Sequence, residues 1–218
     1  MTNVEFIEFR KKYDPKQINF EVLDNLPKGK ISLGASAQYL DFLIPIKDYF
    51  KKNNREVIVK KGSYYDGQVL GCNSNAFDYD SDILLLLCDG KFHALNNSIQ
   101  LKKEIYVFNG LKLDKIEKNE LEIYFKKIKG KQMKYLNSKN IGILVSNKKG
   151  QRSYGAFKIR ERIEKSGKKV YVFFGDSLSI NEFDNFPDID IWVNTACFGL
   201  AMDNNKIVNL SDILEFLN

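Results

Sequence analysis

Cysteine, histidine and long apolar runs are scarce in this chain of 218 residues, and each scarcity excludes a class of protein. The three cysteines, Cys72, Cys88 and Cys197, are widely spaced and form no C-x-x-C motif. An odd, scattered set of cysteines argues against a disulfide framework. The longest apolar run, Ile83 to Cys88, is far shorter than the ~18–20 residues of a membrane span. We therefore expect neither disulfides nor membrane segments.

The first residues and the charge balance bear on location and partners. The sequence Met-Thr-Asn-Val-Glu-Phe-Ile-Glu lacks the basic and apolar regions of a signal peptide, so we expect a cytoplasmic protein. The 34 Lys+Arg residues exceed the 28 Asp+Glu residues, which gives a net charge of +6 with both signs mixed along the chain. The sequence has no RNP-like aromatic motif and no zinc-finger spacing, so we expect no direct binding to nucleic acid.

One cluster of basic residues stands out against this mixed background. It consists of Lys126, Lys127, Lys129, Lys131 and Lys134. The simpler interpretation is the solvated face of a helix. The alternative is an electrostatic footprint for an acidic protein or for nucleic acid.

One supersecondary unit occurs twice in the chain. The first copy predicts a strand, a helix and two more strands, over 30–34, 39–52, 55–60 and 80–87. The second copy predicts the same elements over 140–146, 154–166, 169–174 and 188–194. In both copies an Asp-x-Asp pattern introduces the third strand. Corresponding elements of the two copies are between 108 and 110 residues apart in the sequence. This pattern predicts an α/β fold of two similar small domains, each a parallel sheet flanked by helices.

Segments outside the repeat complete the predicted organisation. They are a strand at 105–108, a charged helix at 118–136 and a capped helix at 211–217. The predicted parts are an N-terminal tail at 1–23, a first domain at 24–113, a helical linker at 114–138 and a second domain at 139–218.

Loops after the predicted strands indicate a ligand cleft. Ligands of α/β sheets bind outside the carboxyl ends of the strands, which here lead into 35–38, 88–93, 147–152 and 195–204. Neither a P-loop nor a Gly-x-Gly-x-x-Gly motif is present. The residues alone therefore predict a binding cleft without naming a reaction.

Several short motifs carry a resemblance to a known family. They are Ser36-Ala-Gln-Tyr39, Gly67-Gln-Val-Leu-Gly-Cys-Asn73, Asp89-Gly-Lys-Phe-His93, Lys149-Gly-Gln151 and Asn194-Thr-Ala-Cys197, the last followed by Ala201 and Asp203. Each motif is weak alone, but their order and spacing resemble the diphthamide synthase family, the 2-(3-amino-3-carboxypropyl)histidine synthases. The resemblance runs from about residue 24 to the C-terminus.

The resemblance implies a cofactor, a substrate and a partner protein. Members of this family have three similar α/β domains, each of which gives one cysteine to a [4Fe–4S] cluster. The cluster, reduced by an electron donor, binds S-adenosylmethionine and breaks its bond to the aminocarboxypropyl group. That group is then added to a histidine of translation elongation factor 2.

The matching positions suggest individual roles. Cys72 and Cys197 correspond to iron ligands, and Gln38, Gly150 and Gln151 to the S-adenosylmethionine site. His93, the only histidine, is either a catalytic or substrate-contacting group or a structural hydrogen-bonding one. Cys88 replaces the first glycine of a family motif, and we expect a buried strand-end cysteine there in preference to a substitute ligand. We expect Asp89 and Asp203 to brace loops.

Two departures from the family pattern shape the hypotheses. The family's first domain, with its cysteine, has no counterpart here, and Phe198-Gly199 replaces Pro-Arg after Cys197. The leading hypothesis is a split synthase, in which a separately encoded first-domain chain or a synthase paralogue supplies the missing ligand. The alternative is a non-catalytic partner or scaffold subunit of a diphthamide synthase. A third hypothesis is a pair of small-molecule-binding domains without a cluster.

Overall fold

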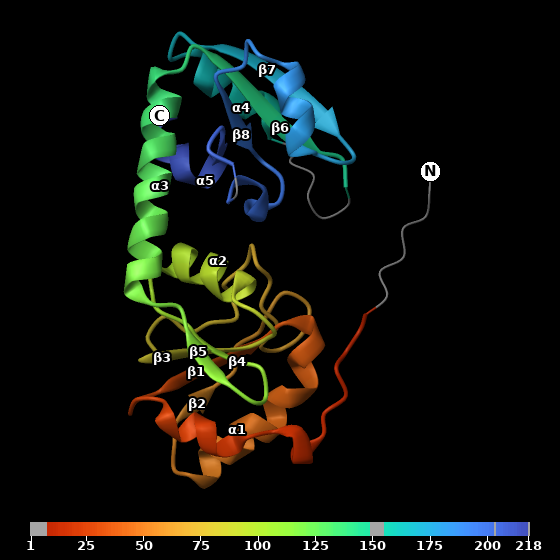
Figure 1. Cartoon of the computed structure of the whole chain (residues 1–218), viewed down its shortest axis with the longest axis vertical. Helices are drawn as coiled ribbons and strands as arrows, with labels where there is room; N and C mark the ends of the chain where they lie inside the picture. Colours follow the sequence, from red (N-terminus) through yellow and green to blue (C-terminus); the bar gives the residue numbers. More distant parts are fainter. Residues whose placement is uncertain (1–7, 149–154, 203, 218) are drawn as a thin grey trace. The chain divides into compact units, whose positions relative to one another are not determined.

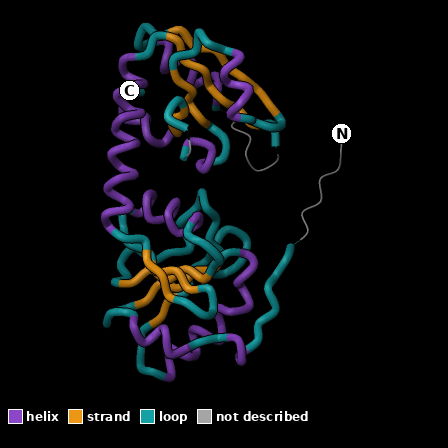
Figure 2. Tube along the Cα trace, viewed as in Figure 1, coloured by secondary structure: helices purple, strands orange, loops and turns teal. Residues whose placement is uncertain are grey.

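The chain divides into two compact units, Met1–Leu121 and Glu122–Asn218. The structure is a computed structural model, and it describes residues 8–148, 155–202 and 204–217 (Figure 1). In each unit the strands gather into one sheet with helices beside it (Figure 2). The predicted fold class, α/β with parallel sheets flanked by helices, is confirmed.

Unit 1 contains a five-stranded sheet in the order β2-β1-β3-β4-β5. Its strands are β1 (Ile31–Ala35), β2 (Val57–Ile58), β3 (Ile83–Leu87), β4 (Tyr106–Phe108) and β5 (Leu113–Lys115). Its helices are α1 (Leu43–Lys52), α2 (Phe92–Leu101) and the 3-10 segments η1 (Pro15–Gln17), η2 (Phe20–Asn25) and η3 (Ala37–Phe42). The first four strands of this order are parallel, and β5 runs antiparallel to β4 at the edge.

Unit 2 contains a four-stranded parallel sheet in the order β7-β6-β8-β9. Its strands are β6 (Asn140–Ser146), β7 (Lys169–Gly175), β8 (Ile191–Asn194) and β9 (Ile207–Asn209). Its helices are α4 (Ala156–Glu164), α5 (Leu210–Ile213) and the 3-10 segments η4 (Ile180–Asn185), η5 (Phe198–Ala201) and η6 (Leu214–Phe216). Helix α3 (Lys118–Asn137) contains the boundary between the units.

The same strand order in both units explains the Asp-x-Asp repeat. In unit 1, Asp82 Oδ2 accepts the backbone N–H of Lys30, just before β1, at 2.9 Å. In unit 2, Asp190 Oδ2 accepts the N–H groups of Lys139 and Asn140, at the start of β6, at 2.8 Å each. Each second aspartate therefore satisfies backbone donors at the amino end of the neighbouring central strand, and its role is structural.

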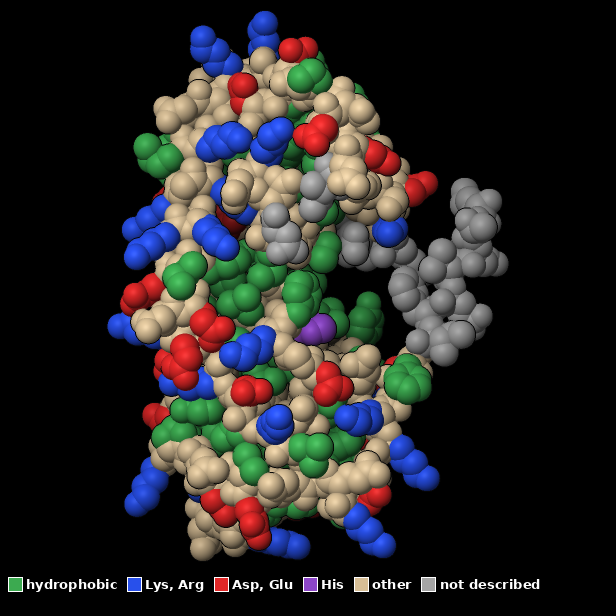
Figure 3. Space-filling model, viewed as in Figure 1, with side chains coloured by type: hydrophobic (Ala, Val, Ile, Leu, Met, Phe, Trp, Pro, Cys, Tyr) green, Lys and Arg blue, Asp and Glu red, His purple; other side chains and the backbone are tan. Residues whose placement is uncertain are grey.

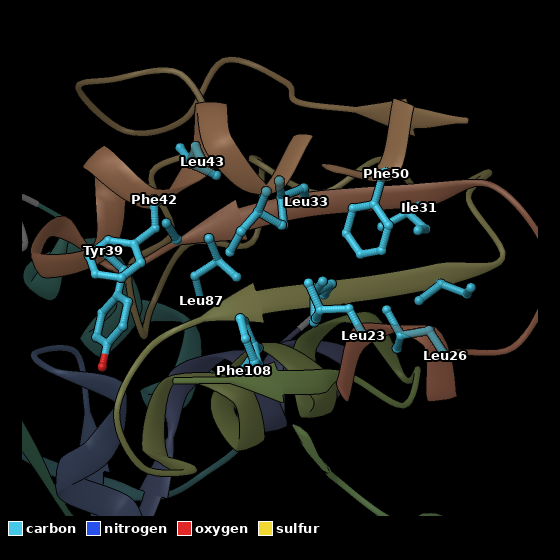
Figure 4. Packing of buried hydrophobic residues seen from close by; sticks show 14 of the residues in the cluster. Leu23, Leu26, Ile31, Leu33, Tyr39, Phe42, Leu43, Phe50, Leu87 and Phe108 are labelled. Carbon is cyan, nitrogen blue, oxygen red and sulfur yellow. The ribbon is translucent and has the colours of Figure 1, made fainter. Parts of the chain in front are cut away.

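Every residue of β1 and β3 is buried, so both faces of the unit 1 sheet are covered, and one hydrophobic core packs on the face that carries Leu33 and Leu87. Side chains of β1 and β3, such as Leu33 and Leu87, pack with Phe50 of α1 and with Leu23 (Figure 4). All four side chains are buried. Leu23 belongs to the segment predicted as a tail, and it lies in the domain core because η2 carries it there.

Alternation along β6 and β8 gives unit 2 a core on each face of its sheet. Ile141 and Ile143 face one side, where they pack with Ile163 of α4. Leu144 and Trp192 face the other side, together with Phe183, Ala201 and Ile207. Trp192 is 1 % exposed, and its ring stacks on that of Phe183 at a centroid distance of 4.8 Å.

Some elements differ from the sequence predictions. The strand predicted at 55–60 pairs only over β2, and α2, β5 and β9 were not predicted. The helix predicted from residue 39 becomes α-helical only at Leu43 and is preceded by η3. Pro45 explains this start, because its ring lacks an N–H and excludes the α-helical turn that precedes it.

The basic cluster on α3 is not uniformly solvated. Lys131 is 7 % exposed, and its Nζ donates a hydrogen bond to the backbone oxygen of Ala201. The solvated-face interpretation is therefore wrong for Lys131, whereas Lys126, Lys127, Lys129 and Lys134 are exposed. Blue and red side chains are interspersed on the face shown in Figure 3, without gathering by sign.

Candidate functional site

A tight turn presents Cys72 beyond the carboxyl end of β1. The chain before it runs beside that strand end, because Val69 N–H donates to Ala35 O at 2.8 Å. Asn73 N–H then donates to Leu70 O at 3.2 Å, which closes a turn with Gly71 and Cys72 at its corners. Cys72 is a free, exposed cysteine.

Helix α2 supports this turn with one polar face. Asn97 Nδ2 donates to Leu70 O at 3.0 Å, and Gln100 Nε2 donates to Gly71 O at 3.1 Å. His93 lies on the same face, because residues at i, i+4 and i+7 share one side of a helix. A Cβ placed on Gly71 would lie 3.7 Å from His93 Cδ2, so the imidazole lies beside the turn.

The surroundings of His93 favour its neutral form. The ring is partly buried, and this burial lowers the pKa of His93 below its ordinary value. The imidazole ring lies nearly perpendicular to the ring of Phe92, in a T-shaped arrangement with a centroid distance of 5.7 Å. At neutral pH the imidazole is therefore uncharged and able to accept a proton.

In unit 2, a buried asparagine shapes the loop that carries Cys197. Asn194, the last residue of β8, is 3 % exposed. Its Nδ2 donates to Cys197 O at 2.8 Å and to Asn209 Oδ1 at 2.7 Å, while its Oδ1 accepts Ala196 N–H at 2.9 Å. This network turns the chain back on itself and leaves Cys197 exposed.

A small pocket of about 140 Å³ opens beside Cys197. It is lined by Ser146, Lys148, Asp176, Ser177, Leu178, Ala196, Cys197 and Leu200. These residues follow or end β6, β7 and β8, so the pocket lies at the carboxyl end of the sheet, as expected for an α/β fold. It combines one thiol, a cation, a carboxylate and hydroxyl groups.

Cys88 lies in a different environment from the other two thiols. It follows β3 directly, is 1 % exposed, and its Sγ lies 3.4 Å from Gly90 O. Burial raises the pKa of the Cys88 thiol to about 12, with the Asp89 carboxylate adding to the effect. A thiol this hard to ionise is a poor metal ligand, which agrees with the expectation of a strand-end core cysteine.

Alkylation should separate the three cysteines. With iodoacetamide at pH 8 under native conditions, we expect Cys72 and Cys197 to react and Cys88 to stay unmodified, because alkylation needs an exposed thiolate. Peptide mass spectrometry would measure the extent at each site. In denaturant, all three cysteines should react. Native labelling of Cys88 as fast as that of Cys72 would contradict its assignment as an inert core residue.

Of the three residues predicted to bind S-adenosylmethionine, the structure describes Gln38 but not Gly150 and Gln151. Gln38 is exposed in η3, next to Tyr39, whose hydroxyl accepts a hydrogen bond from Lys11 Nζ at 3.0 Å. Lys11 Nζ also lies 3.9 Å from the exposed carboxylate of Asp89, whose role in bracing its loop stays a prediction. The predicted residues Gly150 and Gln151, and also Asp203, lie outside the described residues.

The structure brings together neighbours that the motifs did not predict. In unit 1 it places His93 beside the Cys72 turn, and in unit 2 it places Lys148 in the pocket of Cys197. Asn97 and Gln100 were missed, although their helical spacing from His93 is visible in the sequence once α2 is known. Within residues 8–148, 155–202 and 204–217, no group of three His, Cys, Asp or Glu residues is arranged to hold a metal ion.

The thiols occupy different connections of the repeat. Cys72 lies between β2 and β3, whereas Cys197 lies after β8, at the position that Cys88 and Asp89 occupy after β3. By the repeat alone, Cys197 therefore corresponds to Cys88 and not to Cys72.

In the part of the chain that is described, no helix is long and apolar enough to cross a membrane.

Together these features define a class of α/β protein with two parallel-sheet units, each presenting one exposed thiol beyond its strand ends. A family model described as "Putative diphthamide synthesis protein" matches residues 1–207, and the chain belongs to this family. The resemblance inferred from the short motifs is confirmed.

Two curated relatives carry the same name, 2-(3-amino-3-carboxypropyl)histidine synthase. The one from Pyrococcus horikoshii is 26% identical over 183 residues, covering 80% of this chain and 52% of the relative. The one from Methanocaldococcus jannaschii is 28% identical over 141 residues, covering 62% of this chain and 40% of the relative. The chain therefore spans about half or less of the length of these relatives.

Solved structures show the same fold. The crystal structure of Dph2 from Pyrococcus horikoshii matches with a TM-score of 0.80 at 22% identity, over 92% of this chain and 60% of that one. The structure of Dph2 from the same organism with a 4Fe-4S cluster matches with a TM-score of 0.79 at 22% identity, over 89% and 58%.

Proposed function

We propose that this chain is part of a 2-(3-amino-3-carboxypropyl)histidine synthase. It would take part in transferring the 3-amino-3-carboxypropyl group from S-adenosylmethionine to a histidine of translation elongation factor 2. One observation carries this proposal: in a chain of the diphthamide synthesis family, each α/β unit presents one exposed cysteine beyond the carboxyl ends of its strands. The name shared by both curated relatives supports it.

The cysteines present fit two ligands of an iron-sulfur cluster. Thiolates are the usual ligands of iron in such clusters, and Cys72 and Cys197 are exposed and free. Cys88 is unsuited because burial keeps it protonated. The third ligand would therefore come from outside these 218 residues, and we propose a separately encoded first-domain chain or a synthase paralogue as its source. When bound and reduced by an electron donor, the [4Fe–4S] cluster would supply the electron that cleaves S-adenosylmethionine.

The other polar residues would bind and orient the reactants. Lys148, in the pocket beside Cys197, would attract the carboxylate of the aminocarboxypropyl group. Gln38, Gly150 and Gln151 would contact the remainder of S-adenosylmethionine. His93, held neutral by burial, would accept a proton or contact the target histidine.

A second candidate is a non-catalytic partner or scaffold subunit of a diphthamide synthase. It is favoured by Phe198 and Gly199, which open η5 directly after Cys197 without a cation in that 3-10 helix. Lys148, near the end of β6, would bring a positive charge to the same pocket, but Asp176 would bring a negative one, so the pocket's charge does not by itself distinguish the two candidates.

The test of the proposed function is anaerobic reconstitution of the chain with a candidate partner that resembles the family's first domain. With iron and sulfide, the mixture should become brown and hold about four iron atoms per complex, and dithionite would then serve as the electron donor. Adding S-adenosylmethionine and the elongation factor should yield modified histidine, measured by peptide mass spectrometry.

The control is each chain reconstituted alone, which should hold little iron and give no product. A mixture that binds only traces of iron would contradict the proposal that Cys72 and Cys197 are ligands of an iron-sulfur cluster. Equal transfer by the partner without this chain would favour the scaffold alternative.

A further inference from the structure

Helix α2 buries polar side chains where apolar ones are the rule. Asn96, Asn97 and Ser98 are consecutive, and their exposed fractions are 1%, 0% and 0%. Within the described residues, Asn96 Oδ1, Asn97 Oδ1 and Ser98 Oγ have no hydrogen-bond partner. Burying an unsatisfied polar atom is unfavourable, so these side chains are retained at a cost in stability.

The two donors of Asn97 explain why this one of the three side chains is polar. Its Nδ2 makes two hydrogen bonds, to Leu70 O at 3.0 Å and to His93 O at 2.8 Å. One bond reaches the first residue of the Cys72 turn, and the other holds the backbone of α2 at His93. Asn97 therefore leaves its Oδ1 without a partner, while the Nδ2 group of the same carboxamide donates two hydrogen bonds.

Gln100 makes the second attachment, one helical turn further along. Its Nε2 donates to Gly71 O at 3.1 Å. Gly71 also packs closely on the helix, because a Cβ placed there would lie 3.4 Å from both Asn96 Nδ2 and Phe92 Cε1. The two carbonyl oxygens that precede Cys72 are thus both held by side-chain amides of one helix.

We propose that Asn97 and Gln100 are positioning residues for Cys72. Their carboxamides fix the backbone of residues 70 and 71 against α2 and so fix the direction in which the next residue, Cys72, presents its thiol. Without them, the turn is held by its own hydrogen bonds, of which the one from Leu70 N–H to Asn73 O is long, at 3.4 Å. The consequence for iron binding rests on the proposed ligand role of Cys72.

The first arm of the test needs no iron. In the full chain, Gln100→Met removes the donor and keeps the length of the side chain. Hydrogen–deuterium exchange of the peptide that covers residues 68–75 should become roughly three- to tenfold faster, as expected for the loss of one hydrogen bond. Gln100→Lys retains a donor of similar reach and should restore the slow exchange, which a role in packing alone would not produce.

A matched control lies in unit 2. Gln132 Nε2 donates to the backbone oxygen of Asp212 at 2.6 Å, in the unit that does not contain the Cys72 turn. Gln132→Met should leave exchange at residues 68–75 unchanged. Unchanged exchange in Gln100→Met, or equal acceleration by Gln132→Met, would overturn the proposal. If the Gln100 variants fold poorly, Asn97→Leu, which removes both donating N–H groups from a fully buried position and keeps the size of the side chain, gives the same comparison.

The second arm separates this proposal from the proposed function. In the reconstituted complex, Gln100→Met should lower iron content several-fold, and Gln100→Lys should recover it. If the unsubstituted complex binds no iron while the exchange results stand, the ligand role of Cys72 fails and the positioning of its turn is upheld. If the unsubstituted complex binds iron and Gln100→Met binds it equally, Gln100 does not position the ligand.

Discussion

Replacing Cys197 or Cys72 with alanine should abolish iron binding and aminocarboxypropyl transfer in the reconstituted complex. Each substitution removes an exposed thiol that no neighbouring cysteine can replace, because Cys88 is buried and its pKa is raised to about 12. Transfer should fall by more than roughly 100-fold, since even residues that only orient metal ligands are worth 10–100-fold. Iron and sulfide analysis and mass spectrometry of the elongation factor would measure both effects.

Cys88→Ala is the matched control for these two substitutions. It removes a thiol of the same chain and should leave iron content and transfer close to those of the unsubstituted protein. Its cost should be confined to stability, about 1 kcal/mol, as for an ordinary core change. Transfer that survives Cys197→Ala would instead support the scaffold alternative. Loss of iron on Cys88→Ala would identify Cys88 as a ligand.

The second large effect is expected from Gly142→Ala in the centre of β6. A Cβ on Gly142 would lie 2.4 Å from Cε3 and 2.5 Å from Cζ3 of Trp192, and 3.1 Å from Cγ2 of Ile189. Trp192 cannot move aside easily, because it is 1 % exposed and packed by Phe173, Phe183 and Phe186. The free energy of unfolding of unit 2 should fall by about 1–3 kcal/mol, the usual cost of overpacking.

The measurement uses the protein's only tryptophan, Trp192, whose fluorescence reports on the core of unit 2. Denaturant unfolding followed by this fluorescence should show a lower midpoint for Gly142→Ala. Gly130→Ala makes the same substitution at an exposed position of α3, with nothing within 4 Å of the added Cβ. It should be neutral or stabilising by about 0.5–1 kcal/mol. Equal midpoints for the two variants would contradict the packing argument.

The fold could be predicted from the sequence to the extent that its signals are local. The apolar runs of β3 and β6 and the helical spacing in α1 are determined by side chains a few residues apart, and these elements lie close to their predicted positions. The missed elements have weaker local signals. Strands β5 and β9 are three residues each, and α2 has a buried face of polar residues, which conceals its apolar period.

The candidate site could be predicted only in part. The motifs singled out Cys72, Cys197 and His93 as candidates. His93 and Cys197 lie in loops that follow predicted strands, whereas Cys72 lies in none of those loops, and only the structure shows it near the end of β1. The partners that hold these residues come from other parts of the chain: Gln100 is 29 residues from Gly71, and Asn209 is 15 residues from Asn194. Hydrogen bonds across such separations form only when the sheet brings the segments together. No local pattern in the sequence therefore predicts them. The roles proposed for Gln38, Gly150 and Gln151 remain predictions.

Cysteine is scarce in this chain. The sequence by itself determined the number of thiols and the family motifs in which two of them, Cys72 and Cys197, occur. Only the tertiary structure decided their chemical character. Exposure separates Cys72 and Cys197 from Cys88, because the first two lie on turns beyond the strand ends and the third ends a buried strand. The ease with which a thiol ionises depends on its access to water, and folding, which removes water from some side chains and not from others, sets that access.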